Sequence, residues 1–438
     1  MRSRQVSISI GQIKFFGGVF LLLVLGVIGF VVFEGRPAAQ ASEMASATLA
    51  EVATSTAFVP SATHEAPLLA STLSTATNPT ARPTVIYEDG DYPTAIPAAM
   101  PTMSNITPDS LPPGVNPLTG TYPDALHLLD RRPIASKITL YPRNVRPQYG
   151  LAQADVVYEY YIEWGLTRFI AVFYGTNPAQ IGPVRSGRFF DEHIAQMYQA
   201  YLVFKYADKR VLDYFYTSEI RDFLVLPLTS NCSPFFVGTE NRELYNNIFF
   251  DYTRFGPCLN ENGFDNEPPH LQAGYFSQSP QFYGQTALHI FGNYSVDDYH
   301  YWQYDPLKKR YFRYQETDDT RDGKAPDYAP LIDKLTGEQV SADNVVYLFV
   351  PHSFADHWQR EDQVYHIDPT GTGEAYLFRD GLVVPAYWQR FAVDQPLQLT
   401  TPNGEPLFLK PGRTFYEIMS EDSRVDTQGT DWFFEFEP

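Results

Sequence analysis

One segment near the start of the chain determines where the rest of the chain is expected to lie. Residues 15–33 read FFGGVFLLLVLGVIGFVVF, nineteen consecutive positions without a charged side chain. A helix rises about 1.5 Å per residue, so a helix of this length nearly crosses a hydrocarbon layer of about 30 Å. Basic residues precede the segment and an acidic residue follows it, and basic flanks stay in the cytoplasm. Residues 1–34 are therefore predicted to form a cytoplasmic tail and a transmembrane signal anchor, which makes the lipid bilayer a partner through residues 15–33.

A cleaved signal peptide is the alternative interpretation of this segment. Ala39-Gln40-Ala41 has the small-x-small form that a signal peptidase accepts. The apolar run exceeds the roughly 7–15 residues typical of a signal peptide, which favours an uncleaved anchor. Both interpretations export the chain. We therefore expect a single-pass protein of the cell membrane with the bulk of the chain extracytoplasmic.

The next segment, residues 35–113, is rich in Ala, Thr, Ser and Pro and shows no hydrophobic periodicity. Such a composition buries too little apolar surface to offset the entropy of ordering the chain. We expect a disordered linker that lets the folded part work away from the bilayer.

The composition excludes several classes of function. The chain has 438 residues, of which 44% are hydrophobic and 15% aromatic, so most of it is expected to fold. Its net charge of −19 opposes binding to nucleic acid. Two cysteines cannot build a Cys-only zinc site or an iron–sulfur cluster, and no cofactor is expected. Cys232 and Cys258 either form a disulfide, which the external location favours, or pack as buried thiols.

The first folded unit, residues 114–284, combines strand patterns with one helical pattern, which predicts an α+β domain. Strands are expected at residues 134–140, 156–163 and 168–174. The last two are expected to form an antiparallel hairpin. The alternation in the middle strand is typical of a half-buried strand, and it places Glu159 and Glu163 on one face.

A helix is predicted after this hairpin. Phe190, Ile194, Met197 and Tyr201 recur at helical spacing, and Ser186 is a suitable N-cap.

Two arginines lie at the start of this helix, where a cation costs about 0.3–1 kcal/mol unless an anionic group compensates it. They are Arg185 and Arg188. One interpretation is an anion site in which Gly182, Arg185, Ser186 and Arg188 offer amides and guanidinium groups to a phosphate or carboxylate.

The acidic residues of the hairpin provide a second interpretation. Asp155, Glu159 and Glu163 could pair with the same arginines inside the protein, as in many structural networks. Glu159 or Glu163 could also serve as the acid or base of a hydrolase. Four residues of a strand span about 13 Å, which exceeds the roughly 5–9.5 Å between the carboxyl groups of glycoside hydrolases. The two glutamates therefore cannot form such a pair with each other.

Residues 285–438 are predicted to form a mostly β domain with a meander-like sheet. Val345–Val350 is a continuous apolar strand, and Asp380-Gly381 and Asn403-Gly404 are two-residue hairpin signals between apolar runs.

Two further groups of residues in this unit have side chains that can bind a metal ion or a sugar. His352, Asp356, His357 and His366 fit no known metal-ligand spacing, so no metal site is expected. Aromatic residues could stack on sugars if they were exposed together, but their alternation along strands favours half-buried packing. The aromatic residues concerned are Tyr299, Tyr301, Trp302 and Trp388.

Several motifs of the chain, taken together, resemble the YerB-like lipoprotein family, whose domains are designated DUF3048 and have no known function. They are NPLTG (116–120), RPQYGL (146–151), ADVVYE (154–159), GLTRF (165–169) and GPVRSGR (182–188). The resemblance implies an extracytoplasmic two-domain protein without an established activity, cofactor or substrate. It also implies that any shared site includes Arg146, Glu159, Glu163, Arg168, Arg185, Ser186 and Arg188.

The chain departs from this family at its anchor. Relatives often carry a lipid-modified cysteine near the N-terminus, whereas the two cysteines here are Cys232 and Cys258. The apolar segment itself is therefore expected to serve as the anchor.

The sequence thus predicts an α+β protein: an N-terminal membrane anchor and disordered linker, then an α+β domain and a mostly β domain. Its predicted function is that of a membrane-tethered, extracytoplasmic binding or scaffold protein of the bacterial cell envelope. The expected partner is an anionic envelope component or an envelope protein. The residues expected to bind it are Arg146, Arg168, Gly182, Arg185, Ser186 and Arg188. The alternative is an envelope hydrolase acting on glycan or peptide with Glu159 or Glu163 as acid or base.

Overall fold

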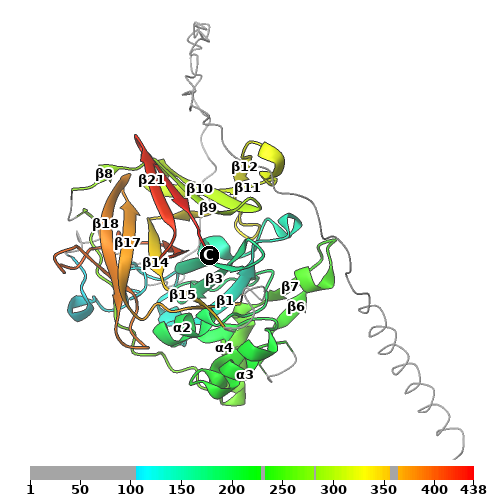
Figure 1. The fold of residues 1–438 in the computed structure, drawn as a ribbon. Coiled ribbons are helices and arrows are strands. Elements are labelled where there is room, and N and C mark those ends of the chain that lie inside the picture. The colour runs from blue at the N-terminus through cyan, green and yellow to red at the C-terminus, as the bar shows by residue number, and fades with distance from the viewer. Residues whose placement is uncertain (1–104, 228–231, 281–282, 356–363) are drawn as a thin grey trace, which may run out of the picture. The chain divides into compact units, whose positions relative to one another are not determined.

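A large mixed sheet organises the fold (Figure 1). The computed structural model describes residues 105–227, 232–280, 283–355 and 364–438, all within one compact unit of the chain. The strands of the large sheet lie in the order β19 (Gln398–Thr400), β18 (Leu382–Arg390), β17 (Gly371–Arg379), β14 (Asn344–Val350), β20 (Thr414–Ser420), β2 (Val156–Glu163), β3 (Leu166–Phe173), β1 (Ile134–Thr139), β4 (Tyr201–Val203) and β5 (Leu224–Val225). The short strand β8 (Gln285–Thr286) pairs with β18.

Strand β20 joins the two halves of this sheet. It lies between β14 and β2 and runs parallel to both. Strands from before and after residue 285 therefore form one continuous sheet. Every residue of β14 and β20 is buried, as expected for central strands that are covered on both faces.

A second sheet packs against one face of the large sheet. Its strands lie in the order β12 (Tyr328–Pro330), β11 (Arg310–Glu316), β10 (Asp298–Asp305), β9 (His289–Ser295), β22 (Asp431–Glu435) and β21 (Arg424–Gln428), with β13 (Ser341–Ala342) also paired to β11. Trp302 of β10 contacts Phe415 of β20 with ring centres 4.8 Å apart. Tyr347 of β14 stacks on Phe434 of β22 at 3.8 Å. Aromatic side chains thus fill the space between the sheets.

The opposite face of β2 is covered by α2 (Phe190–Met197). The ring of Phe190 contacts Tyr158 and Tyr160 of β2, whereas the alternate residue Glu159 faces the second sheet. The other helices are α3 (Lys209–Thr217) and α4 (Tyr252–Asn262). The remaining strands are β6 (Phe235–Val237), β7 (Ile248–Phe250), β15 (His352–Phe354) and β16 (Tyr365–Ile367). Short 3-10 helices are η1 (Pro108–Ser110), η2 (Leu126–Leu129), η3 (Arg143–Val145), η4 (Leu151–Gln153), η5 (Arg221–Phe223), η6 (Leu244–Asn246) and η7 (Arg321–Gly323).

The structure confirms the mixture of helix and sheet, but it corrects two local predictions. β2 is not half-buried, since seven of its eight residues are buried between α2 and the second sheet. The predicted helix ends at Met197, because Tyr201 already begins β4. Its N-cap is Phe189, and the predicted cap Ser186 lies in the preceding loop.

The sheet of residues 285–438 also differs from a simple meander. β17 and β18 form the hairpin predicted at Asp380-Gly381, where both residues have positive φ angles of 55° and 75°. β20, however, does not pair with β19. It lies on the side of β14 opposite β17 and pairs in parallel with β2. No local sequence pattern predicts this pairing.

The predicted membrane segment lies outside the described residues, as do residues 35–104 of the predicted linker. The last part of that linker is ordered, which corrects the prediction. Ile106 is buried, and its backbone exchanges hydrogen bonds of 2.8 and 2.9 Å with Phe276. No helix in the described part of the chain is long and apolar enough to span a membrane.

Cys232 and Cys258 form a disulfide with their Cα atoms 5.5 Å apart. It links the segment before β6 to α4. The disulfide is thus the arrangement adopted, rather than two buried thiols.

Candidate functional site

Three of the residues singled out from the sequence meet at the end of the β2–β3 hairpin. Arg188 donates from Nε to Glu163 Oε2 at 2.8 Å, and its Nη2 contacts the other carboxylate oxygen. Arg168 places Nη2 3.8 Å from Glu163 Oε1 and donates from Nη1 to the carbonyl of Ser186 at 3.0 Å. The internal pairing predicted for Glu163 is therefore present.

A buried group lies directly beneath these residues. Lys137 Nζ lies 3.1 Å from Asp191 Oδ1, and the Tyr160 hydroxyl donates to the same oxygen. The second oxygen of Asp191 accepts the backbone N–H of Arg188 at 2.8 Å. Asp191 lies in the first turn of α2, where a carboxylate is favourable for the helix dipole. The side chain of Asp191 thus ties the start of the helix to β1 and β2.

Arg185 has a different environment. Its guanidinium lies 5.3 Å from the ring centre of Tyr245, and within the part of the chain that the structure describes its side chain makes no ion pair or hydrogen bond. The buried Nε atom has no hydrogen-bond partner. Lys205 lies nearby and donates from Nζ to the carbonyl of Tyr245 at 3.0 Å.

We call these side chains the arginine cluster. The cluster consists of the cations Lys137, Arg168, Arg185, Arg188 and Lys205 and the carboxylates Glu163 and Asp191. When all seven are ionised, five positive charges face two negative ones, which leaves an excess of three.

The pKa values of the cluster side chains reflect both their burial and the excess of positive charge. The pKa of Lys137 is lowered to about 7, chiefly by burial and in addition by the charges of Arg168 and Arg188, while Asp191 opposes the shift. Burial and the charge of Arg188 lower the pKa of Arg168 to about 9. Burial alone would raise the pKa of Glu163, but Arg188 and Arg168 outweigh it and hold this pKa below its usual range. An additional anion here would relieve repulsion among the cations.

Loop amides do not contribute as the sequence suggested. The N–H groups of Arg185, Gly187 and Arg188 all donate within the protein. Gly182 exchanges both backbone hydrogen bonds with Tyr149. These three amides and that of Gly182 are therefore not free for an anion, and a guanidinium group would be the donor that remains at this surface.

Arg146 lies elsewhere. It donates from Nη2 to Glu316 Oε1 on β11 at 2.6 Å, and both residues line an open groove of about 330 Å³ with Arg143 and Pro147. Arg146 therefore contacts the second sheet and is not part of the arginine cluster.

Glu159 lies between the two sheets and has no exposed surface. Its Oε2 lies 2.7 Å from Arg313 Nη2, and Thr167 donates to its Oε1 at 2.6 Å. Arg313 also donates to Glu417 at 2.9 Å. Burial raises the pKa of Glu159 to about 7, and Arg313 opposes this shift. Sequence reasoning missed Arg313 and Glu417, because neither stands in a recognisable motif.

The same place holds a possible set of metal ligands. Glu159, His300 and Glu417 offer ligand atoms within 4.8 Å of one another. The guanidinium of Arg313 already bonds both carboxylates, so the charge that a metal ion would supply is provided by the protein. The triad fits an internal ion network better than a metal centre.

The geometry gives no support to a hydrolase. Glu163 is held by two arginines, which keep it ionised and bonded. Glu159 and its neighbour Glu417 are both fully buried. A catalytic acid or base must reach a proton of its substrate within hydrogen-bond distance, and Glu159 has no solvent access for that.

The other residues weighed for chemistry have structural contacts. His352 bonds the carbonyl of Val350 through Nδ1 at 2.8 Å, and His366 stacks on Phe189 with ring centres 4.0 Å apart. Asp356 and His357 lie outside the described residues. Trp302 and Trp388 are fully buried, so these two tryptophans offer no exposed surface to a sugar.

The fold and these sites were compared with known proteins. Residues 118–265 match the family model described as "Protein of unknown function (DUF3048) N-terminal domain", and residues 290–416 match the corresponding C-terminal domain. The chain is 24% identical over 312 residues to the "Putative lipoprotein YerB" of Bacillus subtilis (strain 168), covering 70% of this chain and 86% of that protein.

A solved structure shows the same fold. The crystal structure of the YerB protein from Bacillus subtilis matches with a TM-score of 0.56 and 22% identity, over 70% of this chain and 96% of that chain. The two family models together cover strands on both sides of β20, the residues of the arginine cluster, and Glu159 and Arg313. The second model ends at residue 416, within β20 and one residue before Glu417. The chain described here belongs to the DUF3048 family.

Proposed function

We propose that this chain is a membrane-attached, extracytoplasmic binding protein whose arginine cluster takes an anionic group of a cell-envelope component. The observation that carries the proposal is the surplus of cations in the cluster. The chain as a whole has a net charge of −19, yet here three arginines and two lysines meet two carboxylates, and cations outnumber carboxylates even when Lys137, whose pKa is about 7, is uncharged. A local excess of the opposite sign attracts an anion and opposes other ligands.

Arg185 is the residue we expect to contact the ligand first. It is half-buried, with no ion pair among the described residues, and its Nε is buried without a partner. A guanidinium in this state gains from a bidentate contact to a phosphate or carboxylate. Ser186 is also half-buried and offers a hydroxyl next to it.

The location rests on two observations. The relative from Bacillus subtilis is described as a lipoprotein. Here both cysteines are joined in a disulfide, so a lipid-modified cysteine is not available. We propose that residues 15–33 attach the chain to the membrane instead, since their length suits a single pass.

A thermal-shift experiment tests the ligand class. The full chain, in a nonionic detergent, is heated with and without poly(glycerol phosphate), a polymer of the anionic class expected in an envelope. We expect the polymer to raise the melting temperature and added salt to reduce the effect. Arg185→Ala is expected to abolish the shift without lowering the melting temperature of the free protein, because Arg185 has no ion pair to lose.

The matched control is Arg424→Ala. Arg424 is exposed on β21, the edge strand of the second sheet, and pairs with Glu437, whereas Arg185 precedes α2 on the opposite face of the large sheet. The polymer should therefore still stabilise this variant. A shift of equal size in the Arg185 and Arg424 variants would mean that the polymer binds by general charge and would contradict the proposal.

A further inference from the structure

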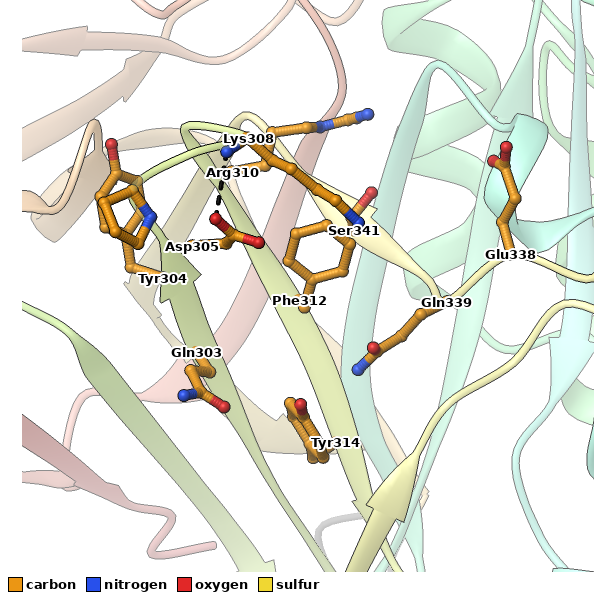
Figure 2. A pocket seen from close by; sticks show the side chains of 11 residues that line it. Gln303, Tyr304, Asp305, Lys308, Arg310, Phe312, Tyr314, Glu338, Gln339 and Ser341 are labelled. Carbon is orange, nitrogen blue, oxygen red and sulfur yellow. Dashed lines mark hydrogen bonds between the residues drawn. The ribbon is translucent and has the colours of Figure 1, made fainter. Parts of the chain in front are cut away.

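A groove lies on the outer face of the second sheet, away from the large sheet (Figure 2). Its volume of about 580 Å³ is within the range of about 300–1,000 Å³ usual for small-molecule sites. Residues of β10, β11 and the segment leading into β13 form its walls. They are Gln303, Tyr304, Asp305, Pro306, Lys308, Arg310, Phe312, Tyr314, Glu338, Gln339 and Ser341.

Several polar side chains that line the groove make no hydrogen bond to other described residues. Among the described residues, the side chains of Gln303, Tyr314, Glu338 and Ser341 make no hydrogen bond, and Lys308 Nζ only faces the ring of Phe312 at 4.8 Å. Groups of this kind within one depression offer both donors and acceptors to a ligand. A ligand with many hydroxyl groups could satisfy them together.

An aromatic ring lies in the middle of these polar groups. Figure 2 shows Phe312 with Gln303 on one side and Gln339 on the other, and Tyr314 further along the same strand. Gln303 and Phe312 are register partners on β10 and β11. An aromatic surface between hydrogen-bonding groups suits a molecule with an apolar face and a polar rim, as a pyranose ring has.

The charge of the groove differs from that of the arginine cluster. The lining carries two acidic side chains, Asp305 and Glu338, and two basic ones, Lys308 and Arg310. Arg310 is paired with Asp343, outside the lining, at 3.1 Å, so the groove has no surplus of positive charge. Such a lining gives no attraction for a polyanion, and we expect a neutral ligand.

A peptide strand is a poorer fit to this place. Peptides often bind by adding a strand to a free sheet edge. The edge of β11 is already occupied by β12 along one stretch and by β13 along another. The edge of β11 beside the groove is therefore not free for an added strand.

We infer that this groove binds a neutral oligosaccharide, with Gln303 and Tyr314 bonding its hydroxyl groups and Phe312 packing against the ring face. The site is independent of the proposed anion site. β10 runs from Asp298, which accepts the N–H of Thr167 at 2.6 Å beside the β2–β3 hairpin, to Asp305 in the groove. At about 3.3 Å per residue this is a separation of about 23 Å.

Calorimetric titration of the full chain tests the inference. The detergent must lack a sugar headgroup, and the probes are the β-1,4-linked tetramers of N-acetylglucosamine and of glucose. We expect at least one tetramer to bind. The double variant Gln303→Ala, Tyr314→Phe should bind it about tenfold more weakly, because each substitution removes one hydrogen-bonding group.

Tyr328→Phe is the matched control. Tyr328 belongs to the neighbouring strand β12 and is not part of the lining, so its loss of a hydroxyl should leave binding unchanged. Tyr314→Phe keeps the ring that stacks on Tyr301 at 4.5 Å, so the variant is expected to fold, and an unchanged melting temperature checks this.

Three results would overturn the inference: no binding of either tetramer at millimolar concentration, equal weakening by Tyr328→Phe, or binding of poly(glycerol phosphate) that the groove variants abolish. Arg185→Ala separates the two sites. The tetramer should bind Arg185→Ala as tightly as it binds the parent protein. Poly(glycerol phosphate) should likewise stabilise the groove variants as it stabilises the parent protein. With both results, failure of one proposal does not affect the other.

Discussion

Glu159 and Glu417 are paired in register on the adjacent parallel strands β2 and β20, and one arginine of the second sheet, Arg313, bonds both carboxylates. All three side chains are fully buried. Trp302 adds a hydrogen bond from Nε1 to Glu417 at 3.0 Å. One guanidinium thus connects the two sheets at the strand junction that unites the halves of the fold.

Replacing Arg313 by methionine should destabilise the protein strongly. The substitution leaves two carboxylates buried without their cation, and breaking a buried ion pair in this way costs about 3–5 kcal/mol. Equilibrium unfolding in urea measures the change. The triple variant Arg313→Met, Glu159→Gln, Glu417→Gln removes the charges together and should recover most of the lost stability. If the single variant unfolds at the same urea concentration as the parent, the network has no structural role.

The pH dependence of stability should change when Glu159 is replaced by glutamine. Two carboxyl groups share one guanidinium, and burial raises the pKa of Glu159 to about 7, above its ordinary value of 4.5. The folded state then binds a proton that the unfolded state releases, so this group contributes stability that is fully present below about pH 4.5 and is lost as the pH rises through about 7.

Melting temperatures of the parent and the Glu159→Gln variant, measured from pH 5 to pH 8, check this prediction. The parent should lose stability relative to the variant as the pH rises. Burial lowers the pKa of His300 to about 3, so this histidine, whose pKa also depends on the charge of Glu159, stays uncharged in the folded parent throughout this range. Parallel curves for the two proteins would contradict the prediction.

Removal of the disulfide should lower stability by about 3 kcal/mol. Cys232 and Cys258 are separated by 26 positions, and closing a loop of this size restricts the unfolded chain by about that amount. The double variant Cys232→Ser, Cys258→Ser should therefore melt at a lower temperature. A reducing agent should lower the melting temperature of the parent but not of the variant, and an effect of equal size on both would count against the disulfide.

Gly412 should not tolerate a side chain. Its φ angle is +139°, and a Cβ atom there would lie 2.1 Å from Asp343 Oδ2. That oxygen accepts the backbone N–H of Arg413 at 3.0 Å beside the start of β20. We expect Gly412→Ala to cost more than the about 1–2 kcal/mol of a strained backbone alone.

Gly404→Ala provides the comparison for Gly412→Ala. Gly404 also has a positive φ, of +82°, but a Cβ atom there meets nothing within 4 Å. Its substitution should show the cost of the backbone conformation without a clash. Equal losses of stability in urea unfolding would show that the contact with Asp343 is unimportant.

Local parts of this fold follow from the sequence, and long-range pairings do not. The strand Val156–Glu163 has the predicted bounds because alternating aromatic and polar residues specify a strand whatever surrounds it. Its burial could not be predicted, because it depends on α2 on one side and the second sheet on the other. The partner of Glu159 is Arg313, far along the chain, and no local pattern links them.

The arginine cluster was predicted in part for the same reason. Glu163 and Arg168 lie on the β2–β3 hairpin and Arg188 lies in the loop that soon follows it, so the pairing of Glu163 with an arginine can be predicted from the sequence. Lys137 comes from β1, and its approach to Asp191 depends on how the sheet and α2 pack. The groove at Phe312 and Tyr314 could not be predicted, because aromatic residues alternate in the same way along any half-buried strand.

The position of β20 sets an order on the maturation of the protein. β2 and β14 both precede β20 in the sequence, and each lacks a neighbour until residues 414–420 have been synthesised. The central sheet therefore closes only when β20 is present, and a chain truncated before β20 would expose two unpaired strand edges that invite aggregation.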